Sequence, residues 1–244
     1  MPRSPIDWDA YARYYDTLTT LIPYQEMLDT VCHHLHECQT PILDAGCGTG
    51  NVTHLLTQVT DEITAIDQAQ EMLSRARAKC AGETVSFKQV DLDEVLPFQG
   101  DTFGAIVCVN VLYAVKNPAE TLAEFYRILR PEGTLVLVTP KAGYENGLIL
   151  KAHADSPKPD EHWLNMHCSP QWERARAKEA LGEKSEAFLE LIRFNRRIAE
   201  SATFHFFTPR TLIRCVKEAG FQSVYTEAVY ADQNILLSAR KESS

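Results

Sequence analysis

Apolar residues in the first 140 positions follow two alternating patterns, which are short continuous runs and helical spacing. The continuous runs predict strands at residues 41–44, 63–66, 85–90, 103–109 and 134–138. Between the runs, apolar residues recur three or four positions apart, which predicts amphipathic helices. Apolar strands that alternate with such helices are typical of a parallel sheet with helices on both faces. Right-handed crossovers then lead us to expect a doubly wound α/β fold.

The two ends of the chain add further elements to this pattern. Helices are predicted at residues 6–20, 24–38 and 208–220, and a closing antiparallel strand pair at 221–229 and 234–239. The last helix has Thr208 as its N-cap and Gly220 just past its end. We therefore expect a mostly parallel, seven-stranded sheet with one antiparallel strand and N-terminal helices.

Residues 141–207 interrupt the alternation after the fifth strand. Ser169-Pro170 predicts the start of one helix, Gly182 its end, and Ser185 the cap of another. In such sheets, ligands bind beyond the carboxyl ends of the strands. We interpret the insertion as a helical lid over that edge, and a dimerisation element or a plain stabilising flap is the alternative. The rest of the chain, 1–140 with 208–244, forms the main domain in this interpretation.

The first predicted strand contains Asp44 and leads into Gly46, Gly48 and Gly50. Glycines there permit positive φ and let the backbone approach a ligand closely. Free N–H groups at the following helix start suit an anion. The spacing G-x-G-x-G differs from the G-x-G-x-x-G of nicotinamide sites, and the phosphate-loop signature is absent. We expect a ligand here, and a tight turn without one is the alternative.

Acidic residues follow the next two strands. Asp67 ends the second strand and lies 17 residues after the last glycine of the turn, where a carboxylate can accept hydrogen bonds from both hydroxyls of a ribose. Asp91 follows the third strand and is a candidate for contact with an adenine amino group. The alternatives are a surface acid for Asp67 and a solvated turn residue for Asp91.

Residues 43–50, Leu-Asp-Ala-Gly-Cys-Gly-Thr-Gly, resemble motif I of the class I S-adenosylmethionine-dependent methyltransferases. The resemblance continues in order and spacing over about residues 40–140, through Ile66-Asp67, Met72-Leu73, Val90-Asp91-Leu92, 103–113 and 127–135. It implies a Rossmann-like fold, S-adenosylmethionine as cofactor and S-adenosylhomocysteine as product. The sequence departs from the family pattern at Ala69, Gly104 and Glu132, where we expect a cost in capping or turn stability alone.

The resemblance also implies site residues. Cofactor contacts are expected at Tyr11, Tyr15, Asp44, Gly46, Cys47, Gly48, Asp67, Gln68, Met72, Asp91, Leu92 and Asn110. In small-molecule members, a tyrosine-rich first helix closes over the cofactor. The two tyrosines here share a helix face, and a core-facing aromatic pair is the alternative. For the methyl acceptor we expect Tyr113, His162, Trp163 and His167. No residue is assigned as a catalytic base.

Charge narrows the class of substrate. The chain has 24 Lys and Arg against 33 Asp and Glu, a net charge of −9. Nucleic acids and anionic membranes are bound by basic surfaces, so we expect neither as a partner. Asn110 is not followed by the P-P-[YF] run that marks amide or nucleobase N-methylation in this family. Residues 151–200 carry nine basic and nine acidic side chains, and this neutral, aromatic-containing stretch suits a small organic acceptor.

Cysteine and histidine usage predicts neither disulfides nor a metal site. The seven cysteines are odd in number and form no C-x-x-C pair, which is typical of reduced intracellular thiols. No metal-binding pattern accompanies His153, His162, His167 and His205. We expect them to be solvated loop residues, or one of them to act as a general base. The chain shows no signal segment and no apolar run near the ~18 residues of a membrane span, which predicts a cytoplasmic protein. A monomer and a homodimer are both open.

These patterns together predict in-line methyl transfer from S-adenosylmethionine to a small metabolite or natural product. One alternative is a member of the same fold that does not methylate, such as a cyclase or an enzyme that handles carboxymethyl groups. Another is a non-catalytic binding partner, whose motif I we would expect to be damaged, whereas Asp44, the three glycines and Asp67 are intact here. The acceptor and its atom (carbon, nitrogen, oxygen or sulfur) stay open.

Overall fold

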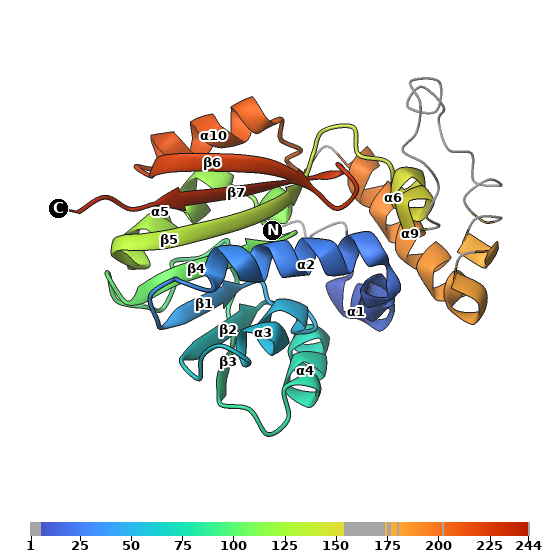
Figure 1. Cartoon of the computed structure of the whole chain (residues 1–244), viewed down its shortest axis with the longest axis horizontal. Helices are drawn as coiled ribbons and strands as arrows, with labels where there is room; N and C mark the ends of the chain where they lie inside the picture. The colour runs from blue at the N-terminus through green and yellow to red at the C-terminus, as the bar shows by residue number, and fades with distance from the viewer. Residues whose placement is uncertain (1–5, 154–173, 175–176, 180, 202, 244) are drawn as a thin grey trace.

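A single seven-stranded sheet forms the centre of the molecule (Figure 1). The computed structural model describes residues 6–153, 174, 177–179, 181–201 and 203–243. The strand order is β3-β2-β1-β4-β5-β7-β6, and β7 alone runs antiparallel to its neighbours β5 and β6. The strands are β1 Ile42–Ala45, β2 Ile63–Asp67, β3 Val85–Gln89, β4 Phe103–Val109, β5 Leu129–Pro140, β6 Gln222–Val229 and β7 Asn234–Arg240. This confirms the predicted doubly wound α/β class.

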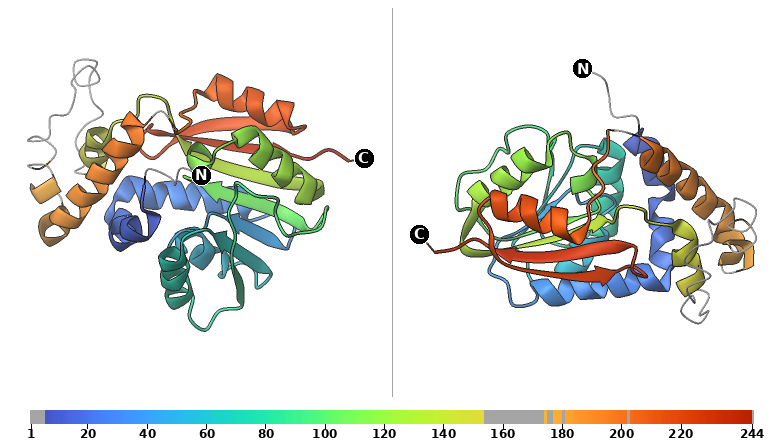
Figure 2. Two further views of the ribbon diagram at one scale, coloured as in Figure 1. Left: turned by 180° about the vertical axis from the view of Figure 1, so that it is seen from behind. Right: turned by 90° about the horizontal axis from the view of Figure 1, so that it is seen from above.

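Helices cover both faces of the sheet and its carboxyl edge (Figure 2). They are α1 Trp8–Tyr15, α2 Ile22–Leu35, α3 Asn51–Leu56, α4 Gln70–Lys79, α5 Pro118–Ile128, α6 Asn146–His153, α9 Ser185–Glu200 and α10 Pro209–Glu218. Short 3-10 turns occur at η1 Asp16–Thr20, η2 Leu112–Ala114 and η3 Gly182–Lys184. The α10 helix begins with Thr208 as a capping-box residue, as the sequence predicts.

Strand β4 shows how the two layers are built. Every residue of β4 is buried, and successive side chains of a strand point to opposite faces. Val107 therefore belongs to the apolar cluster on the α2 side, and Cys108 to the cluster on the side of α5 and α10. A strand buried on both faces needs the continuous apolar run that the sequence shows at 103–109.

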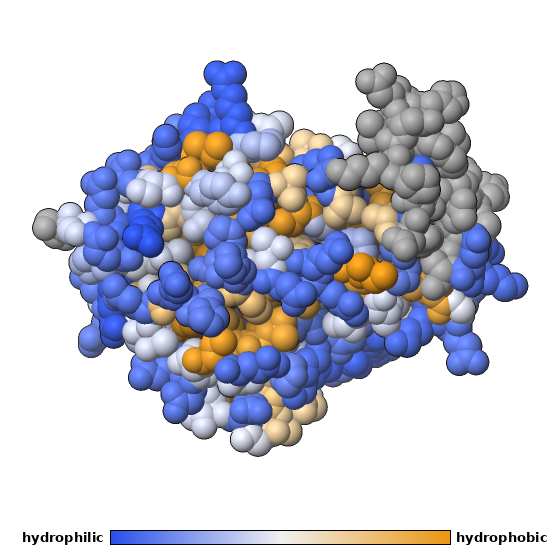
Figure 3. All heavy atoms as spheres, viewed as in Figure 1, coloured by the Kyte–Doolittle hydropathy of each residue, from blue (hydrophilic) through white to orange (hydrophobic). Residues whose placement is uncertain are grey.

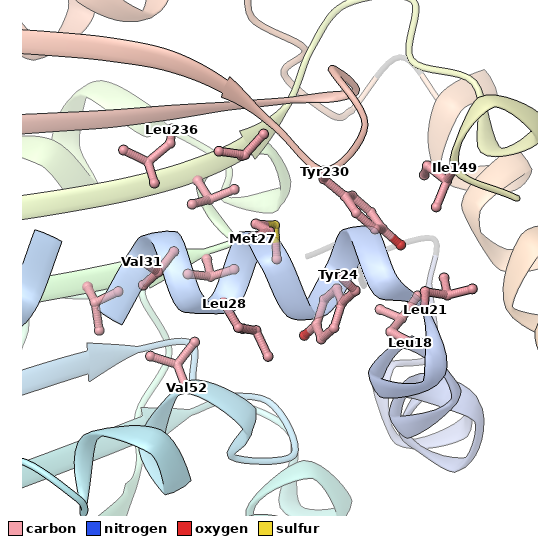
Figure 4. Close-up of a cluster of buried hydrophobic side chains, with 14 of the residues drawn as sticks. Leu18, Leu21, Tyr24, Met27, Leu28, Val31, Val52, Ile149, Tyr230 and Leu236 are labelled. Carbon is pink, nitrogen blue, oxygen red and sulfur yellow. The ribbon is translucent and has the colours of Figure 1, made fainter. Parts of the chain in front are cut away.

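Helix α2 joins the sheet to the elements at its carboxyl edge (Figure 4). Met27 and Val31 are fully buried in the cluster that includes Leu236 of β7. At the amino end of the helix, the ring of Tyr24 lies edge-on to that of Tyr230, with centroids 5.7 Å apart. Burying a large apolar side chain contributes roughly 1.5–3 kcal/mol, so this helix is a major part of the core.

Two predicted helix boundaries differ from the structure at the N-terminus. The stretch predicted as one helix over 6–20 consists of α1 followed by the 3-10 turn η1. Helix α2 begins at Ile22, before Pro23, because proline is tolerated in the first turn, where its missing N–H has no helical partner. It ends at Leu35 instead of residue 38.

Two departures from the family pattern have distinct structural consequences. Glu132 adopts a left-handed backbone with φ of 62°. Glycine would adopt this conformation without strain, so a cost in turn stability is expected at Glu132, as the sequence predicts. Gly104 is different, because a Cβ there would lie 2.3 Å from the backbone oxygen of Gln39. Glycine is therefore required at this point of β4, and the expectation of a mere stability cost at Gly104 is wrong.

The insertion contributes α6 and α9, which lie with α1 beyond the carboxyl ends of the parallel strands (Figures 1 and 2). The predicted helix start at Ser169-Pro170 lies outside the described residues. Gly182 begins the 3-10 turn η3. Ser185 is the first residue of α9 and Lys184 is its N-cap, so the predicted cap is wrong by one residue.

The surface seen in Figure 3 is mainly hydrophilic, and its apolar side chains form several separate groups. Among the described residues, no helix has both the length and the apolar composition to cross a membrane. The described cysteines, Cys32, Cys38, Cys47, Cys80, Cys108 and Cys215, are all free thiols.

Candidate functional site

A cavity opens at the carboxyl ends of the parallel strands, between the sheet and the three helices α1, α6 and α9. The space between its walls, counting the part open to solvent, is about 910 Å³. Small-molecule sites usually measure about 300–1,000 Å³. Nine residues that the sequence predicts for the site line this cavity: Tyr11, Tyr15, Gly46, Gly48, Asp67, Gln68, Met72, Asn110 and Tyr113.

The glycine turn after β1 forms the floor of the cavity. The N–H groups of Gly46 and Cys47 donate to the carbonyl of Ile66, at 2.8 and 2.9 Å. Gly46 has φ of 76°, and a Cβ there would lie 2.4 Å from a methyl group of Val111. The turn thus requires glycine, and its first N–H groups bond to β2. The turn therefore lets a ligand approach the backbone closely, but the N–H groups of Gly46 and Cys47 are already used and cannot donate to the ligand.

Asp67 closes the turn from the end of β2. Its Oδ2 accepts from the N–H of Gly48 at 2.9 Å, and its Oδ1 accepts from the N–H of Ala69 at 2.8 Å. Burial raises the pKa of Asp67, and the backbone N–H groups of Ala69, Gly48 and Gln68 act in the opposite direction. A carboxylate has about four acceptor positions, so two remain for further donors. A vicinal diol such as that of a ribose matches this need.

Asp44 precedes the glycine turn and Cys47 lies within it, and neither residue lines the cavity. Asp44 is 1% exposed, accepts from the hydroxyl of Thr53 at 2.6 Å, and has its pKa raised to about 7 by burial. Burial also raises the pKa of the Cys47 thiol far above its ordinary value, so this thiol is not a nucleophile at neutral pH. Both residues support the turn, and direct cofactor contact by either stays a prediction.

Asp91 and Leu92 also stand outside the cavity lining. Leu92 packs in the apolar cluster on the α5 side, and the Asp91 carboxylate accepts from the N–H of Asp93 at 3.0 Å. Gln68 does line the cavity, and its backbone oxygen accepts from the side chain of Gln89 at 2.9 Å. An adenine contact at Asp91 and Leu92 stays a prediction.

Helix α1 covers the cavity and is tied to α4 at both ends. The carboxylate of Asp9 accepts from the N–H of Glu71 at 2.9 Å, which caps α4 where Ala69 has no capping side chain. Beyond the other end of α1, Asp16 accepts from Lys79 Nζ at 2.8 Å and from the hydroxyl of Thr49 at 2.5 Å. These contacts hold the N-terminal segment over the glycine turn.

Two aromatic residues of α1 face the cavity. The rings of Tyr11 and Tyr15 lie 5.5 Å apart between centroids. The hydroxyl of Tyr11 donates to Asn195 of α9 at 2.9 Å, and the ring of Tyr15 approaches Gly48. Helix α1 therefore contacts both α9 and the glycine turn.

The residues predicted for the acceptor are partly outside the described chain. Tyr113 of η2 is buried at the cavity wall, and burial raises its pKa. His162, Trp163 and His167 lie outside the described residues. The described His153 and His205 do not line the cavity. The Nδ1 of His153 accepts from the backbone N–H of Ile22 at 3.1 Å.

Sequence reasoning missed much of the opposite wall. Its residues include Trp8, Tyr144, Asn146, Asn195, Tyr230 and Asn234. Each comes from a different element or connection, so no local spacing marks them. One weak signal existed, because Asn195 lies inside α9, where asparagine has poor helix propensity. Asn234 donates to the side-chain oxygen of Asn110 at 2.7 Å, which links β7 to the end of β4.

Charged side chains are rare around the cavity. Asp67 is the one charged side chain among its described lining residues. In the described part of the chain, no three His, Cys, Asp or Glu side chains gather closely enough to hold a metal ion.

The central part of the chain matches a known family model. The model described as "Methyltransferase domain" matches residues 43–137, which include the glycine turn, Asp67 and β4. This segment supplies most of the cavity floor and little of the wall formed by α1, α6 and α9.

Curated relatives and a solved structure that resemble this chain are also named as methyltransferases. The chain is 32% identical over 133 residues to YqeM of Bacillus subtilis, a protein named as a methyltransferase, with 53% of each chain covered. This chain thus spans about half the length of that relative. It is 29% identical over 210 residues to a malonyl-[acyl-carrier protein] O-methyltransferase of a Paenibacillus species, covering 82% of this chain and 70% of that one. An S-adenosylmethionine-dependent methyltransferase of Mesorhizobium loti shares the fold, with a TM-score of 0.58, 19% identity, and 87% and 96% of the chains covered.

Proposed function

The chain belongs to the class I, Rossmann-like S-adenosylmethionine-dependent methyltransferases, and from this premise we propose that it transfers a methyl group from S-adenosylmethionine to a small organic molecule. The observation that carries the proposal is the bond between Gly48 and Asp67 at the cavity floor. It joins the glycine turn to a carboxylate with acceptor positions left for a ribose.

The residues present fit this cofactor. Gly48 leaves a crevice in which even a Cβ would contact Tyr15 and Met72, at 3.6 and 3.9 Å. We propose that Asp67 accepts the ribose hydroxyls, that Met72 and Gln68 border the adenine, and that Asn110 borders the amino-acid end. When bound, S-adenosylmethionine supplies a methyl group already activated by its sulfonium. The protein then has to align the acceptor and exclude water.

We propose residues 141–207 as a lid domain over residues 1–140 and 208–244. Asn146 of α6 and Asn195 of α9 support this, because both reach the cavity from the insertion. His162, Trp163 and His167 belong to the same insertion, and we propose that they contact the acceptor. The net charge of −9 supports a small acceptor over a nucleic acid. The free thiols support a cytoplasmic location.

The described lining residues offer no good general base to remove a proton from the methyl acceptor. Asp67 is engaged by Gly48 and Ala69 at the cofactor end. Burial raises the pKa of Tyr11 and of Tyr113, so both are neutral hydroxyls at pH 7. We therefore propose that the described residues act by alignment, and that the nucleophile is one that needs no strong base.

Calorimetric titration with S-adenosylmethionine and with S-adenosylhomocysteine tests the cofactor. We expect micromolar binding of both. The second step is incubation of the protein with methyl-labelled S-adenosylmethionine and a metabolite extract, followed by mass spectrometry of small molecules. A labelled small molecule, lost when excess S-adenosylhomocysteine is added, is the expected result.

Each failure has its own meaning. Binding of neither nucleoside would remove the cofactor assignment. Binding without any labelled product, together with conversion of an unlabelled extract component, would identify a non-methylating enzyme such as a cyclase. Binding with no chemical change would leave the non-catalytic partner.

A further inference from the structure

The cavity has two chemically different parts. The cofactor part consists of Gly46, Gly48, Asp67, Gln68 and Met72. The acceptor part lies opposite and includes Trp8, Tyr113, Tyr144, Asn146, Asn195 and Tyr230. The assignment of the second part to the methyl acceptor rests on the proposed function.

Aromatic rings hold one another in place along the acceptor part. Phe206 lies between Tyr113 and Tyr144, with centroids 5.9 and 6.0 Å away and planes within 21° and 30° of parallel. Phe204 contacts Tyr113 at 5.7 Å and Trp8 at 6.4 Å between centroids. Because each cavity ring packs against a further ring, the wall is preorganised, and a flat molecule can bind it without first ordering it.

Side-chain amides supply the polar groups of the acceptor part. Asn195 accepts from Tyr11 at 2.9 Å and donates to the side-chain oxygen of Asn146 at 3.3 Å. The amide NH2 of Asn146 has no hydrogen-bond partner within the described part of the chain, and Asn146 lines the cavity. It is therefore a neutral donor available to a ligand, and a hydroxyl or carbonyl oxygen is its natural partner.

The described lining of the acceptor part contains no carboxylate, lysine, arginine or histidine. A charged acceptor placed there would lose its hydration without gaining an opposite charge, which is strongly unfavourable. A cationic acceptor would also lie next to the positive sulfonium of the proposed cofactor. Neutral ligands avoid both costs.

We propose that the methyl acceptor is an uncharged molecule with a flat aromatic ring and an oxygen substituent. The ring lies against the wall formed by Tyr113, Tyr144 and Trp8, and the oxygen accepts from the amide of Asn146. Anionic acids and protonated amines of the same shape are disfavoured, because the described lining of the acceptor part offers them no opposite charge.

Three naphthalene probes of one shape and different charge test this inference. They are 1-naphthol, 1-naphthoate and 1-naphthylmethylammonium, titrated calorimetrically at pH 7 into protein saturated with S-adenosylhomocysteine. We expect naphthol to bind at least tenfold more tightly than either charged probe. Equal or tighter binding of a charged probe, or no binding of any probe, overturns the proposal.

A charge introduced into the wall gives an independent check. In Asn146→Asp, a carboxylate replaces the neutral donor, and we expect the affinity for naphthylmethylammonium to rise at least tenfold and that for naphthol to fall. Gln58→Glu makes the same change at an exposed position outside the cavity and should leave all three affinities as they were. Unchanged affinities in Asn146→Asp would also overturn the proposal.

The saturation step separates this inference from the proposed function. If S-adenosylhomocysteine does not bind, the cofactor assignment fails and the naphthalene series is titrated into the protein alone, where the same ranking is expected of the neutral wall. If S-adenosylhomocysteine binds and the ranking is absent, the acceptor class alone is wrong.

Discussion

The cofactor part and the acceptor part of the cavity are built in opposite ways. The cofactor part comes from one short stretch, residues 46–72, and backbone groups fix it, as in the bonds from Gly46 to Ile66 and from Gly48 to Asp67. The acceptor part draws on elements from α1 to β7, and side chains fix it, as in the contacts of Asn195 with Tyr11 and Asn146. Backbone geometry restricts which residues can occur at each position of the cofactor part. Side-chain contacts across the fold allow many different combinations of residues in the acceptor part.

The largest expected difference between the two parts is in pH dependence, through Asp44, which precedes the glycine turn. Its pKa is about 7 in the folded protein, against about 3.9 in an unfolded chain. Between these values the folded state binds the extra proton, so the contribution of Asp44 to the free energy of unfolding falls as pH rises from 4 to 7 and then levels off. Three pKa units correspond to a loss of about 4 kcal/mol. Urea unfolding at pH values from 4 to 8 measures it.

Two variants isolate the Asp44 contribution. Asp44→Asn keeps a side-chain oxygen for Thr53 but cannot ionise, so its free energy of unfolding should fall less between pH 4 and 7 than that of the parent protein. Asp61→Asn changes an exposed acid and should keep the parent slope. Parallel slopes for the parent and Asp44→Asn would contradict the buried-carboxyl explanation.

The next effect concerns cofactor affinity. Asp67→Ala removes two charge-assisted hydrogen bonds to the proposed ribose, which we expect to cost about 2–4 kcal/mol in binding. This corresponds to a roughly 30- to 900-fold weaker affinity. S-adenosylmethionine and S-adenosylhomocysteine share the ribose, so calorimetry should show equal losses for both. Asp61→Ala is the matched control, and a loss confined to one nucleoside would place Asp67 elsewhere than at the ribose.

The same contrast explains how far the sequence alone could predict this protein. The strands and helices followed from apolar patterning because the sheet is buried on both faces, as β4 shows. Asp67 was predictable because its place at the end of β2 follows from that patterning. Asn195 was not, since only the packing of α9 against α1 brings it to the cavity. Tyr144 was not either, since it lies in the connection before α6 and its hydroxyl donates to the backbone oxygen of Asn195 at 3.3 Å. Leu92 is a different case, because it packs in the apolar cluster on the α5 side and its contact with the cofactor stays a prediction.

A smaller effect tests whether backbone geometry really fixes the cofactor part. Both Gly46 and Gly82 have positive φ, at 76° and 95°, but only Gly46 has a neighbour, Val111, that an added Cβ would strike. Gly82→Ala carries the backbone strain alone, about 1 kcal/mol. Gly46→Ala adds overpacking and should cost about 2–3 kcal/mol in unfolding free energy. Chemical denaturation of both variants gives the difference, and equal losses would mean that the turn yields to the added methyl group.

The smallest effect concerns helix α1, which contacts both parts of the cavity. Asp16 and Lys79 are 39% and 24% exposed, so their pair at 2.8 Å contributes about 0.5–1 kcal/mol after solvent screening. A double-mutant cycle of Asp16→Asn and Lys79→Met measures this coupling in the unfolding free energy and in S-adenosylhomocysteine affinity. Coupling in both quantities would show that α1, which lies over Gly48, belongs to the cofactor part of the cavity. If the coupling occurs in unfolding alone, α1 belongs to the acceptor part through Tyr11 and Asn195. Zero coupling in both would mean that apolar packing alone holds the helix.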